Sequence, residues 1–296
     1  MIIFNEKAHS YTSILGDPYT SVTTKIGKYK PDIDWDKKAE NYVKKHKSDI
    51  NILVDLANKA SLTMEEAELK FGTTFSKERI REIWKMKGAN AARGGTTWHN
   101  WMEKQDSGRD NAVYIPLVNG EKEAIDLSKI EPNKVYLEMM LYNNKAKICG
   151  QADRVFTFDN TSEVRDWKTV NKDLVPEVIA YWQKVGNRNK QVQAKFKKPL
   201  NVLYNSYWEY AMQLSMYGYM LETYGFPPRK KYNEAGDVIS EGLVIDQVLT
   251  DWVTQEQLED NIAIDYDSIL KKYRIVTDVI EIHPPYLKEE VKKILK

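Results

Sequence analysis

The sequence predicts a mixed α/β (α+β) fold, in which helices flank a central mixed sheet that contains an antiparallel meander. Two observations support this prediction. Between residues 135 and 170, three strand-like runs are separated by the turn signals YNNKA and FDNTS, and such short connections favour antiparallel pairing. Helical periodicity occupies the chain both before and after this segment. An N-terminal hairpin and a helical region are expected to precede the meander.

The N-terminal third predicts a hairpin followed by helices. Residues 1–30 alternate apolar and polar positions around LGDPYTSVT, a stretch rich in turn-forming residues, which is typical of a β-hairpin. From Trp35 to about Arg93, apolar positions recur with a helical period. Within this region, residues 63–72 show a capping pattern and a terminal glycine, and residues 76–92 begin with a serine suited to cap a helix.

The middle of the chain predicts a change of element at a glycine pair. Gly94 and Gly95 interrupt the helical pattern, so we expect one helix to end before them and a new helix to begin near Thr96. Residues 113–134 predict an irregular segment with one or two short strands. The meander follows this segment.

The C-terminal part predicts alternating helices and strands. Residues 206–225 form a strongly periodic helix ended by Gly225, and a polar loop leads to a strand over 242–249. The tail is expected to contain a helix (255–272), a strand (276–284) and a closing helix (289–296).

Composition narrows the class of protein. The chain has 296 residues, of which 42% are hydrophobic and 11% aromatic, and this is typical of a globular protein with a substantial core. Its formal net charge of +1 provides no global attraction for a polyanion, so such binding needs a local arrangement of charge. The single cysteine, Cys149, excludes an internal disulfide and any four-cysteine zinc or iron–sulfur site. Without a signal sequence or an apolar span, we expect a soluble, cytoplasmic protein in a reducing compartment.

The third strand of the meander carries a pattern of charges that suggests chemistry. Asp166 and Lys168 share one face of this strand, and the turn before it brings Asp153 of the preceding strand close to Asp166. Two adjacent carboxylates repel each other, so one takes up a proton or a cation neutralises both, and Mg²⁺ is such a cation. The alternative is a surface salt bridge to Lys168, which would contribute about 0–1 kcal/mol.

Three further groups have both a functional and an ordinary interpretation. His99 and Glu103 lie four residues apart on one helical face, either as an exposed pair or facing the sheet. Gln213 and Tyr217 share a face in the same way, either as part of a packed helix or as contacts to a phosphate and the carboxylates. Glu138, on the first meander strand, either faces solvent or supports Asp153 as a nearby acid.

The order of these pieces resembles that of the PD-(D/E)XK nucleases of the RecB-like group. RGGTTWHNWME resembles their helix motif, GQADRV their G-x-x-D strand, VRDWKT their (D/E)-x-K strand and QLSMY their Q-x-x-x-Y helix. The resemblance covers about residues 93 to 222, and the nearest kin are phage exonucleases and the mitochondrial genome maintenance exonuclease. It implies a restriction-endonuclease-like core and a single nuclease domain over 1–296. In this division, 1–92 lines the substrate, 93–230 forms the catalytic core, and 231–296 completes it.

The resemblance also implies roles for individual residues. It assigns metal ligation to His99, Asp153 and Asp166, together with the backbone carbonyl of Trp167. It assigns Lys168 to water activation or to stabilisation of transition-state charge. Site-shaping roles fall to Gln213 and Tyr217, and Glu103 is a further candidate metal ligand.

The implied chemistry is hydrolysis of phosphodiester bonds with Mg²⁺ or Mn²⁺ and 5′-phosphate products. The iron–sulfur cluster of cysteine-bearing relatives is not expected, because Cys149 stands alone. No helicase motif is present, so a motor would have to be a separate protein.

The implied substrate is DNA, with free ends or single strands favoured, and the expected partners are a phage recombinase or a single-strand-binding protein. Helices over 35–93 that arch over the site would favour such ends. Between residues 178 and 208 the chain carries no acidic residue, which predicts either a lid along the phosphate backbone or a solvated loop. Its basic candidates for DNA contact are Lys184, Arg188, Lys190, Lys195, Lys197 and Lys198. Aromatic candidates for base stacking, or for the core, are Trp182, Tyr204, Tyr207 and Trp208.

Three alternatives remain at the level of sequence. One is a structure- or sequence-specific endonuclease on the same core. Another is a non-catalytic DNA-binding accessory in recombination or packaging, against which the intact Asp153, Asp166 and Lys168 argue. A metal-dependent enzyme acting on small molecules has little support, because no nucleotide-binding glycine loop is present.

Overall fold

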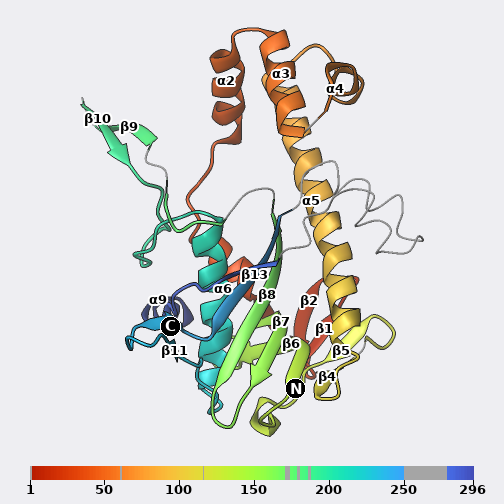
Figure 1. Ribbon diagram of the computed structural model, residues 1–296, viewed down its shortest axis with the longest axis vertical. Coiled ribbons are helices and arrows are strands. Elements are labelled where there is room, and N and C mark those ends of the chain that lie inside the picture. The colour runs from red at the N-terminus through yellow and green to blue at the C-terminus, as the bar shows by residue number, and fades with distance from the viewer. Residues whose placement is uncertain are drawn as a thin grey trace.

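The structure, a computed structural model, has a mixed sheet with helices on both sides (Figure 1). The residues that it describes are 2–60, 62–115, 117–170, 174–178, 181–185, 188–249 and 279–296. Within these residues, ten strands join in one sheet, and two further pairs of strands form separate ribbons. The predicted class, a mixed α/β fold with a central sheet flanked by helices, is therefore confirmed.

The N-terminal segment forms three short antiparallel strands, one more than the predicted hairpin. They are β1 (Ile2–Asn5), β2 (Ser10–Ser13) and β3 (Pro18–Ser21). Helix α1 (Val22–Gly27) follows at once, because the Ser21 hydroxyl accepts a hydrogen bond from the Thr24 N–H and caps the helix. β3 also pairs parallel with β7 (Ile148–Thr157), so the N-terminal strands are joined to the main sheet.

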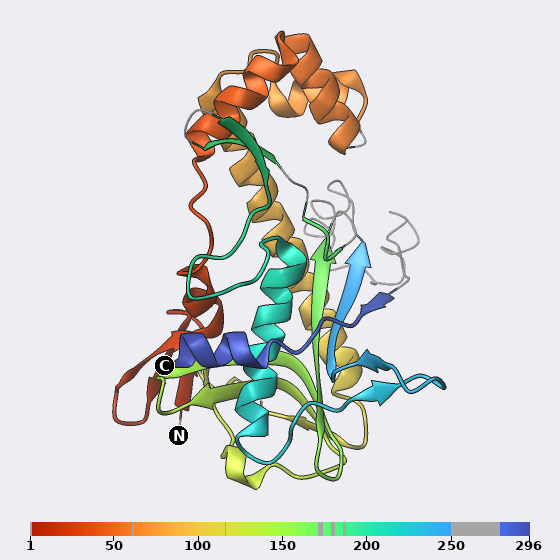
Figure 2. The same cartoon turned by 90° about the vertical axis from the view of Figure 1, so that its left-hand side faces the viewer.

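The helical region, which the periodicity over 35–93 predicts, forms a lobe with its own apolar core. Its elements are α2 (Trp35–His46), α3 (Asp49–Ala60), α4 (Met64–Phe71) and the first turns of α5 (Lys77–Asp106). Leu56, Phe71 and Ile83 belong to this core, which is a cluster distinct from the one that packs against the sheet. Figures 1 and 2 show the lobe beyond one end of the sheet, at the top of α5.

Helix α5 is continuous from Lys77 to Asp106, so the predicted new helix near Thr96 is wrong. A glycine in a helix interior costs about 1 kcal/mol relative to alanine, and this penalty has to be offset by packing. A Cβ on Gly95 would lie only 3.2 Å from the Thr169 hydroxyl of β8 (Ser162–Val170). The glycine therefore allows a close approach of helix and sheet and does not end the helix.

The predicted antiparallel meander is confirmed, with β6 (Val135–Asn143) and β8 on either side of β7. β13 (Leu243–Leu249) lies parallel to β8, and β14 (Val279–Ile282) lies antiparallel to β13. The segment before the meander has the two short strands expected of it. They are β4 (Ala112–Tyr114), parallel to β6, and β5 (Glu121–Glu123), antiparallel to β1, followed by a 3-10 turn (Leu127–Lys129).

Helices cover the two faces of the central strands. α6 (Ser206–Glu222), which was predicted, packs on one face of β8 and β13, and α5 lies on the opposite face of β8 (Figure 1). The closing helix α9 (Lys288–Leu295), also predicted, packs against α6.

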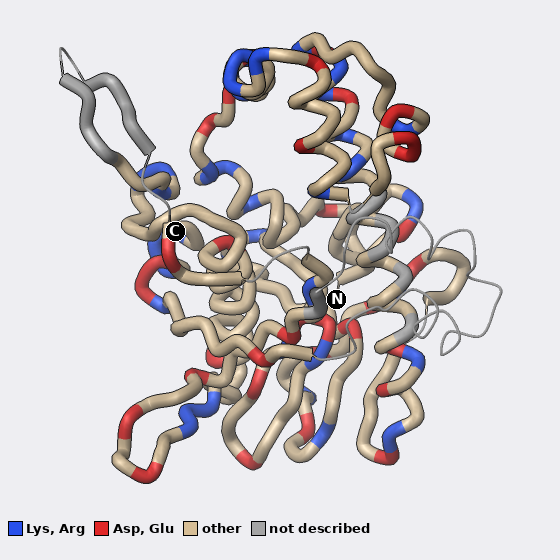
Figure 3. Tube along the Cα trace, turned by 45° about the horizontal axis from the view of Figure 1, so that its top comes forward, with Lys and Arg blue, Asp and Glu red and all other residues tan. Residues whose placement is uncertain are grey.

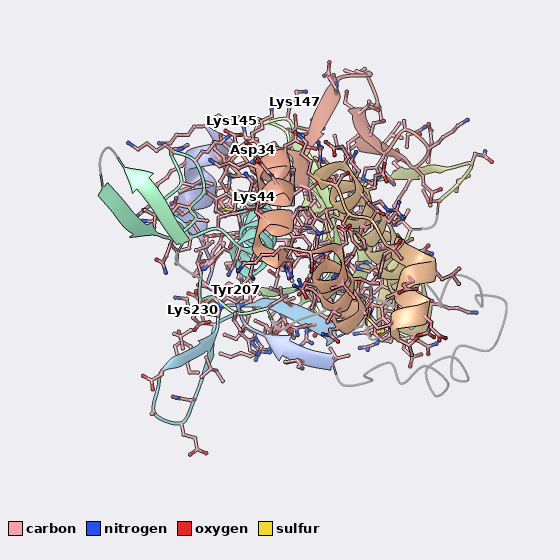
Figure 4. The ribbon with its side chains drawn as sticks, turned by 90° about the horizontal axis from the view of Figure 1, so that it is seen from above. Asp34, Lys44, Lys145, Lys147, Tyr207 and Lys230 are labelled. Carbon is pink, nitrogen blue, oxygen red and sulfur yellow. The ribbon has the colours of Figure 1, made fainter. Side chains whose placement is uncertain are left out.

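Two ribbons project from the body. β9 (Tyr181–Val185) pairs with β10 (Arg188–Val192), so part of the basic segment is a hairpin. β11 (Lys231–Tyr232) pairs with β12 (Val238–Ser240), and Figure 4 shows this second ribbon extending outward past Lys230. The predicted strand near the C-terminus is β14, whereas the helix predicted over 255–272 lies outside the described residues.

The contact between α6 and the sheet can be tested with two glycines that lie in helices. A Cβ on Gly218 of α6 would lie 2.9 Å from Pro228 Cγ and 3.3 Å from Leu243 Cδ2. We expect Gly218→Ala to lower the free energy of unfolding by about 1–3 kcal/mol, because it overpacks the core. Gly88→Ala, with nothing within 4 Å of the new Cβ, should raise it by about 1 kcal/mol. Urea denaturation measures both, and changes of the same sign would contradict the packing described.

Candidate metal centre and active site

The site lies where the pairing of β7 with β8 stops. The described pairs of these strands end at Arg154 and Arg165, and the same register continued by one residue places Asp153 opposite Asp166. Both aspartates are buried. The sequence therefore placed these two acids correctly on neighbouring strands.

Side chains take over the hydrogen bonds of the main chain at this point. The Trp167 N–H donates to Asp153 Oδ2 over 2.6 Å, and the Trp167 carbonyl oxygen lies 2.9 Å from His99 Nε2. A carbonyl only accepts, so Nε2 carries the ring proton in this contact. The Trp167 backbone is thereby satisfied by one side chain from β7 and one from α5.

His99 is oriented as a metal-ligating histidine is. Its Nδ1 atom lies 3.5 Å from Asp153 Oδ2, while Nε2 donates to a backbone carbonyl, which is the usual outer contact of such a histidine. Burial opposes the charged imidazole, but the Asp153 carboxylate outweighs burial and raises the pKa of His99 to about 9. Asp153 is affected in the opposite sense, since burial is outweighed by His99 and the pKa of Asp153 falls to about 2.

Asp166 and Lys168 form a buried ion pair on the face of β8 covered by α6. The Lys168 ammonium also lies 5.0 Å from the centre of the Tyr210 ring. Burial, with the charge of Asp153 added, raises the pKa of Asp166 to about 7. Burial opposes the charge of Lys168, but Asp166 outweighs it and raises the pKa of the ammonium, which is therefore charged at neutral pH.

Glu138 lies beside Asp153. The sequence left open whether Glu138 faces solvent or supports Asp153, and the structure shows the second position. β6 and β7 keep one register on both sides of Glu138, so this residue stands opposite Asp153. Its φ of 48° is in the left-handed region, where a side chain costs roughly 1–3 kcal/mol and which is often found at functional sites. Its carboxylate accepts a hydrogen bond from the Gln151 amide. Burial, followed by the charge of Asp153, raises the pKa of Glu138 to about 8.

Three of these residues fit a divalent cation. In the part of the chain that the structure describes, His99, Glu138 and Asp153 each offer a ligand atom, and these atoms lie within 4.8 Å of one another. Opposite ligands of Mg²⁺ or Mn²⁺ stand about 4 Å apart, because each bond is about 2.1 Å long, so a small contraction closes the group. Asp166, a predicted ligand, is not a member of this group and contacts Lys168 instead. Sequence patterns alone did not single out Glu138 as a ligand.

A cavity of about 660 Å³ opens beside these residues. Gln213 and Tyr217 of α6 line it, as predicted, and the Gln213 amide donates to the Tyr217 hydroxyl over 3.3 Å. A Cβ on Gly150 would lie 2.7 Å from Tyr217 Cε1, so a glycine is needed for the ring to reach this position. Glu103 lines the same cavity, and its carboxylate, after burial, raises the pKa of Tyr114 to about 12.

The N-terminal strands form another wall of the cavity. Phe4, Tyr11 and Ser21 line it from the first three strands, and Lys122 lines it from β5. No residue of α2, α3 or α4 lines this cavity; within residues 1–92 its lining comes from the N-terminal strands and the turn after β1, from α1 and from Ala92 of α5. The substrate-lining role of residues 1–92 stays a prediction.

A network of buried charges on the opposite face of the sheet supports Trp167. Arg154 lies 4.4 Å from the centre of the Trp167 ring and forms ion pairs with Asp246 of β13 and with Asp106 of α5. Arg165 extends the network by binding Asp246 over 3.1 Å. The sequence analysis did not predict this network. Its signal was the presence of charged residues in strands whose other residues are typical of a sheet interior.

The basic segment contributes no residue to this cavity among those described. Lys195, Lys197 and Lys198 are exposed, and the Lys197 ammonium binds Asp32 over 2.6 Å. Lys184, Arg188, Lys190 and Trp182 lie on the β9–β10 ribbon, whose side chains are outside the description. Figure 3 shows both signs of charge interspersed along the chain, in agreement with its net charge of +1.

Three of the four aromatic candidates belong to the core or pack against it, one of the two alternatives considered for them. Tyr207 is buried, and Tyr204 and Trp208 pack against the main core cluster. The Trp208 indole N–H also donates to the Pro176 carbonyl over 2.8 Å. These three rings are therefore already engaged within the protein.

Comparisons of the chain with protein-family models, with curated proteins and with solved structures find no match. Among the described residues, no helix has both the length and the apolar character needed to cross a membrane. The chemistry of the site therefore has to be inferred from its own residues.

The candidate metal centre predicts stabilisation by Mn²⁺. At a concentration 100 times its dissociation constant, an ion that binds only the folded chain adds about 2.7 kcal/mol to the free energy of unfolding. We expect Mn²⁺ to raise the melting temperature of the protein, and Asp153→Asn to abolish this rise by removing a ligand. The exposed Glu234→Gln is the matched control and should retain it. Differential scanning fluorimetry measures all three proteins, and an Mn²⁺ effect that survives Asp153→Asn would place the ion elsewhere.

Proposed function

We propose that this protein is a metal-dependent deoxyribonuclease of the PD-(D/E)XK type, in the RecB-like group, and that it acts as an exonuclease. The observation that carries the proposal is the convergence of His99, Glu138 and Asp153 beside the Asp166–Lys168 ion pair, with His99, Glu138 and Lys168 lining one cavity. Buried carboxylates with raised pKa values are costly in a purely structural role, and they cluster at functional sites.

The residues of the site divide the work of phosphodiester hydrolysis. His99 Nδ1 and the carboxylates of Asp153 and Glu138 would hold Mg²⁺ or Mn²⁺, which would polarise a phosphate oxygen and make a water molecule more acidic. The His99 Nε2–H donates its hydrogen bond to the Trp167 carbonyl oxygen and thereby fixes the orientation of the ring. Lys168, kept charged by Asp166, neutralises the negative charge that develops on the phosphate.

The dimensions of the cavity favour the end of a strand as substrate. About 660 Å³ lies within the range of pockets for small ligands, which suits one end of a strand better than a continuous duplex. Tyr114, which is 41% exposed, lines the cavity and offers ring surface to an unpaired base. We therefore favour hydrolysis from DNA ends or single strands with 5′-phosphate products, in phage or cellular DNA recombination, replication or repair. The partners we propose are a recombinase or a single-strand-binding protein, in the cytoplasm.

Removal of the Lys168 charge should separate cleavage from metal binding. We expect Lys168→Met to lower the rate of cleavage by at least about 100-fold, the loss typical of one group that stabilises transition-state charge. The variant should keep its circular dichroism spectrum and the Mn²⁺ effect on melting temperature. Lys195→Met, which removes an exposed lysine, is the control and should cut at the wild-type rate. Cleavage of labelled DNA by Lys168→Met at that same rate would refute the role of the ammonium.

The form of DNA that is degraded tests exonuclease action. With Mg²⁺ or Mn²⁺, we expect linear single-stranded or duplex DNA to be shortened from its ends to products with 5′-phosphates. Covalently closed circular DNA should stay intact, because it offers no end to the cavity. Gel analysis of the circular and linear forms of one plasmid, and of its single strands, measures this. Cutting of the closed circle would assign the site to an endonuclease.

A further inference from the structure

Lys122 is a buried lysine in the wall of the same cavity, and the mechanism above does not use it. It lies in β5, opposite Phe4 of β1, and only 5% of its surface is exposed. A lysine so deeply buried is rare unless a partner compensates its charge. The groups that contact the Lys122 ammonium therefore indicate the role of its charge.

The ammonium of Lys122 is held beside Glu138. Its Nζ donates a hydrogen bond to the Glu138 carbonyl oxygen over 3.2 Å and lies 5.3 Å from the centre of the Tyr114 ring. Glu138 has its left-handed φ at the point where the described β6–β7 pairs are interrupted, so its carbonyl is accessible to the lysine. Burial lowers the pKa of Lys122, and the carboxylates of Glu138 and Glu103 act against this effect.

The charges of the site balance with a single divalent cation. Four carboxylates line or adjoin this end of the cavity, and two ammonium groups face them. They are Glu103, Glu138, Asp153 and Asp166, with Lys122 and Lys168. With His99 neutral as a ligand, one divalent ion brings the formal charge of this group to zero. A second ion would leave a net positive charge in a largely buried space, which is costly. Glu6 also lines the cavity, but from an exposed turn where water screens its charge.

We propose that Lys122 is a resident cation that occupies, beside Glu138 and Glu103, the place of a second divalent ion, so that the site binds one such ion per chain. The proposal rests on the proposed nuclease function and makes that function more specific. Lys122 thereby sets the number of ions in the site, and it acts through the two glutamates rather than on the substrate itself.

The test is the stoichiometry of Mn²⁺ binding to the full chain without DNA, measured by isothermal titration calorimetry. We expect one ion per chain in the wild type and in Lys122→Arg, which keeps the charge. Lys122→Met should bind a second, weaker ion, because loss of the ammonium leaves Glu103 uncompensated and the group one negative charge short of neutrality with the first ion in place. Lys145→Met removes an exposed lysine and is the control for net charge, with one ion expected. In the double variant Lys122→Met with Glu103→Gln, the second ion should be lost again.

Two results would overturn the proposal. Binding of two ions by the wild type would overturn it, even if Lys122→Met failed to fold. A folded Lys122→Met that still binds one ion with unchanged affinity would overturn it as well. Either result with normal DNA cleavage leaves the nuclease function standing. A wild-type chain that binds no Mn²⁺ and cuts no DNA would refute the proposed function itself, and this proposal with it.

Discussion

The geometry of the site depends on the hydrogen bonds of the Trp167 backbone. β7 and β8 cease to pair just before this residue, so its N–H and C=O need other partners. Asp153 supplies an acceptor for the N–H, and His99 supplies a donor for the carbonyl. Both side chains are thereby fixed in place, and the remaining Asp153 oxygen and His99 Nδ1 are left for chemistry. An unsatisfied buried backbone group costs roughly 1–3 kcal/mol, so each of these contacts also serves stability.

Ion pairs on the face of the sheet behind Trp167 also hold the residues of the site in position. Arg154 contacts the Trp167 ring and binds Asp246 and Asp106, which tie together β7, β13 and α5. Removal of one partner from such a buried pair leaves an uncompensated charge and costs about 3–5 kcal/mol, so the network resists relative movement of these elements. His99 lies on α5 and Asp153 on β7. The network therefore constrains the two elements whose separation decides whether these residues can share an ion.

The sequence predicted most of the main sheet and the closeness of the two aspartates, for identifiable reasons. Short turns determine an antiparallel meander, and alternation along strands placed Asp153 near Asp166. The continuity of α5 was missed because the reason for Gly95 is Thr169, which lies far away in sequence. Glu138 was ambiguous because its left-handed φ cannot be read from alternation. Lys122 gave no signal, since it lies in a strand of three residues whose partner, β1, is at the start of the chain.

The N-terminal strands are part of the site and not an appendage to it. Lys168 approaches the acids from the α6 side, whereas Lys122 approaches Glu138 from β5, which pairs with β1. β1 and β2 reach the main sheet through β3, which pairs with β7 at Ile148 and Cys149. The Lys122 ammonium, which lies across the acids from Lys168, is therefore in place only when the first strands are paired with β7. The charged cavity is accordingly complete only when the N-terminal strands are in place, because neither lysine alone balances the acids between them.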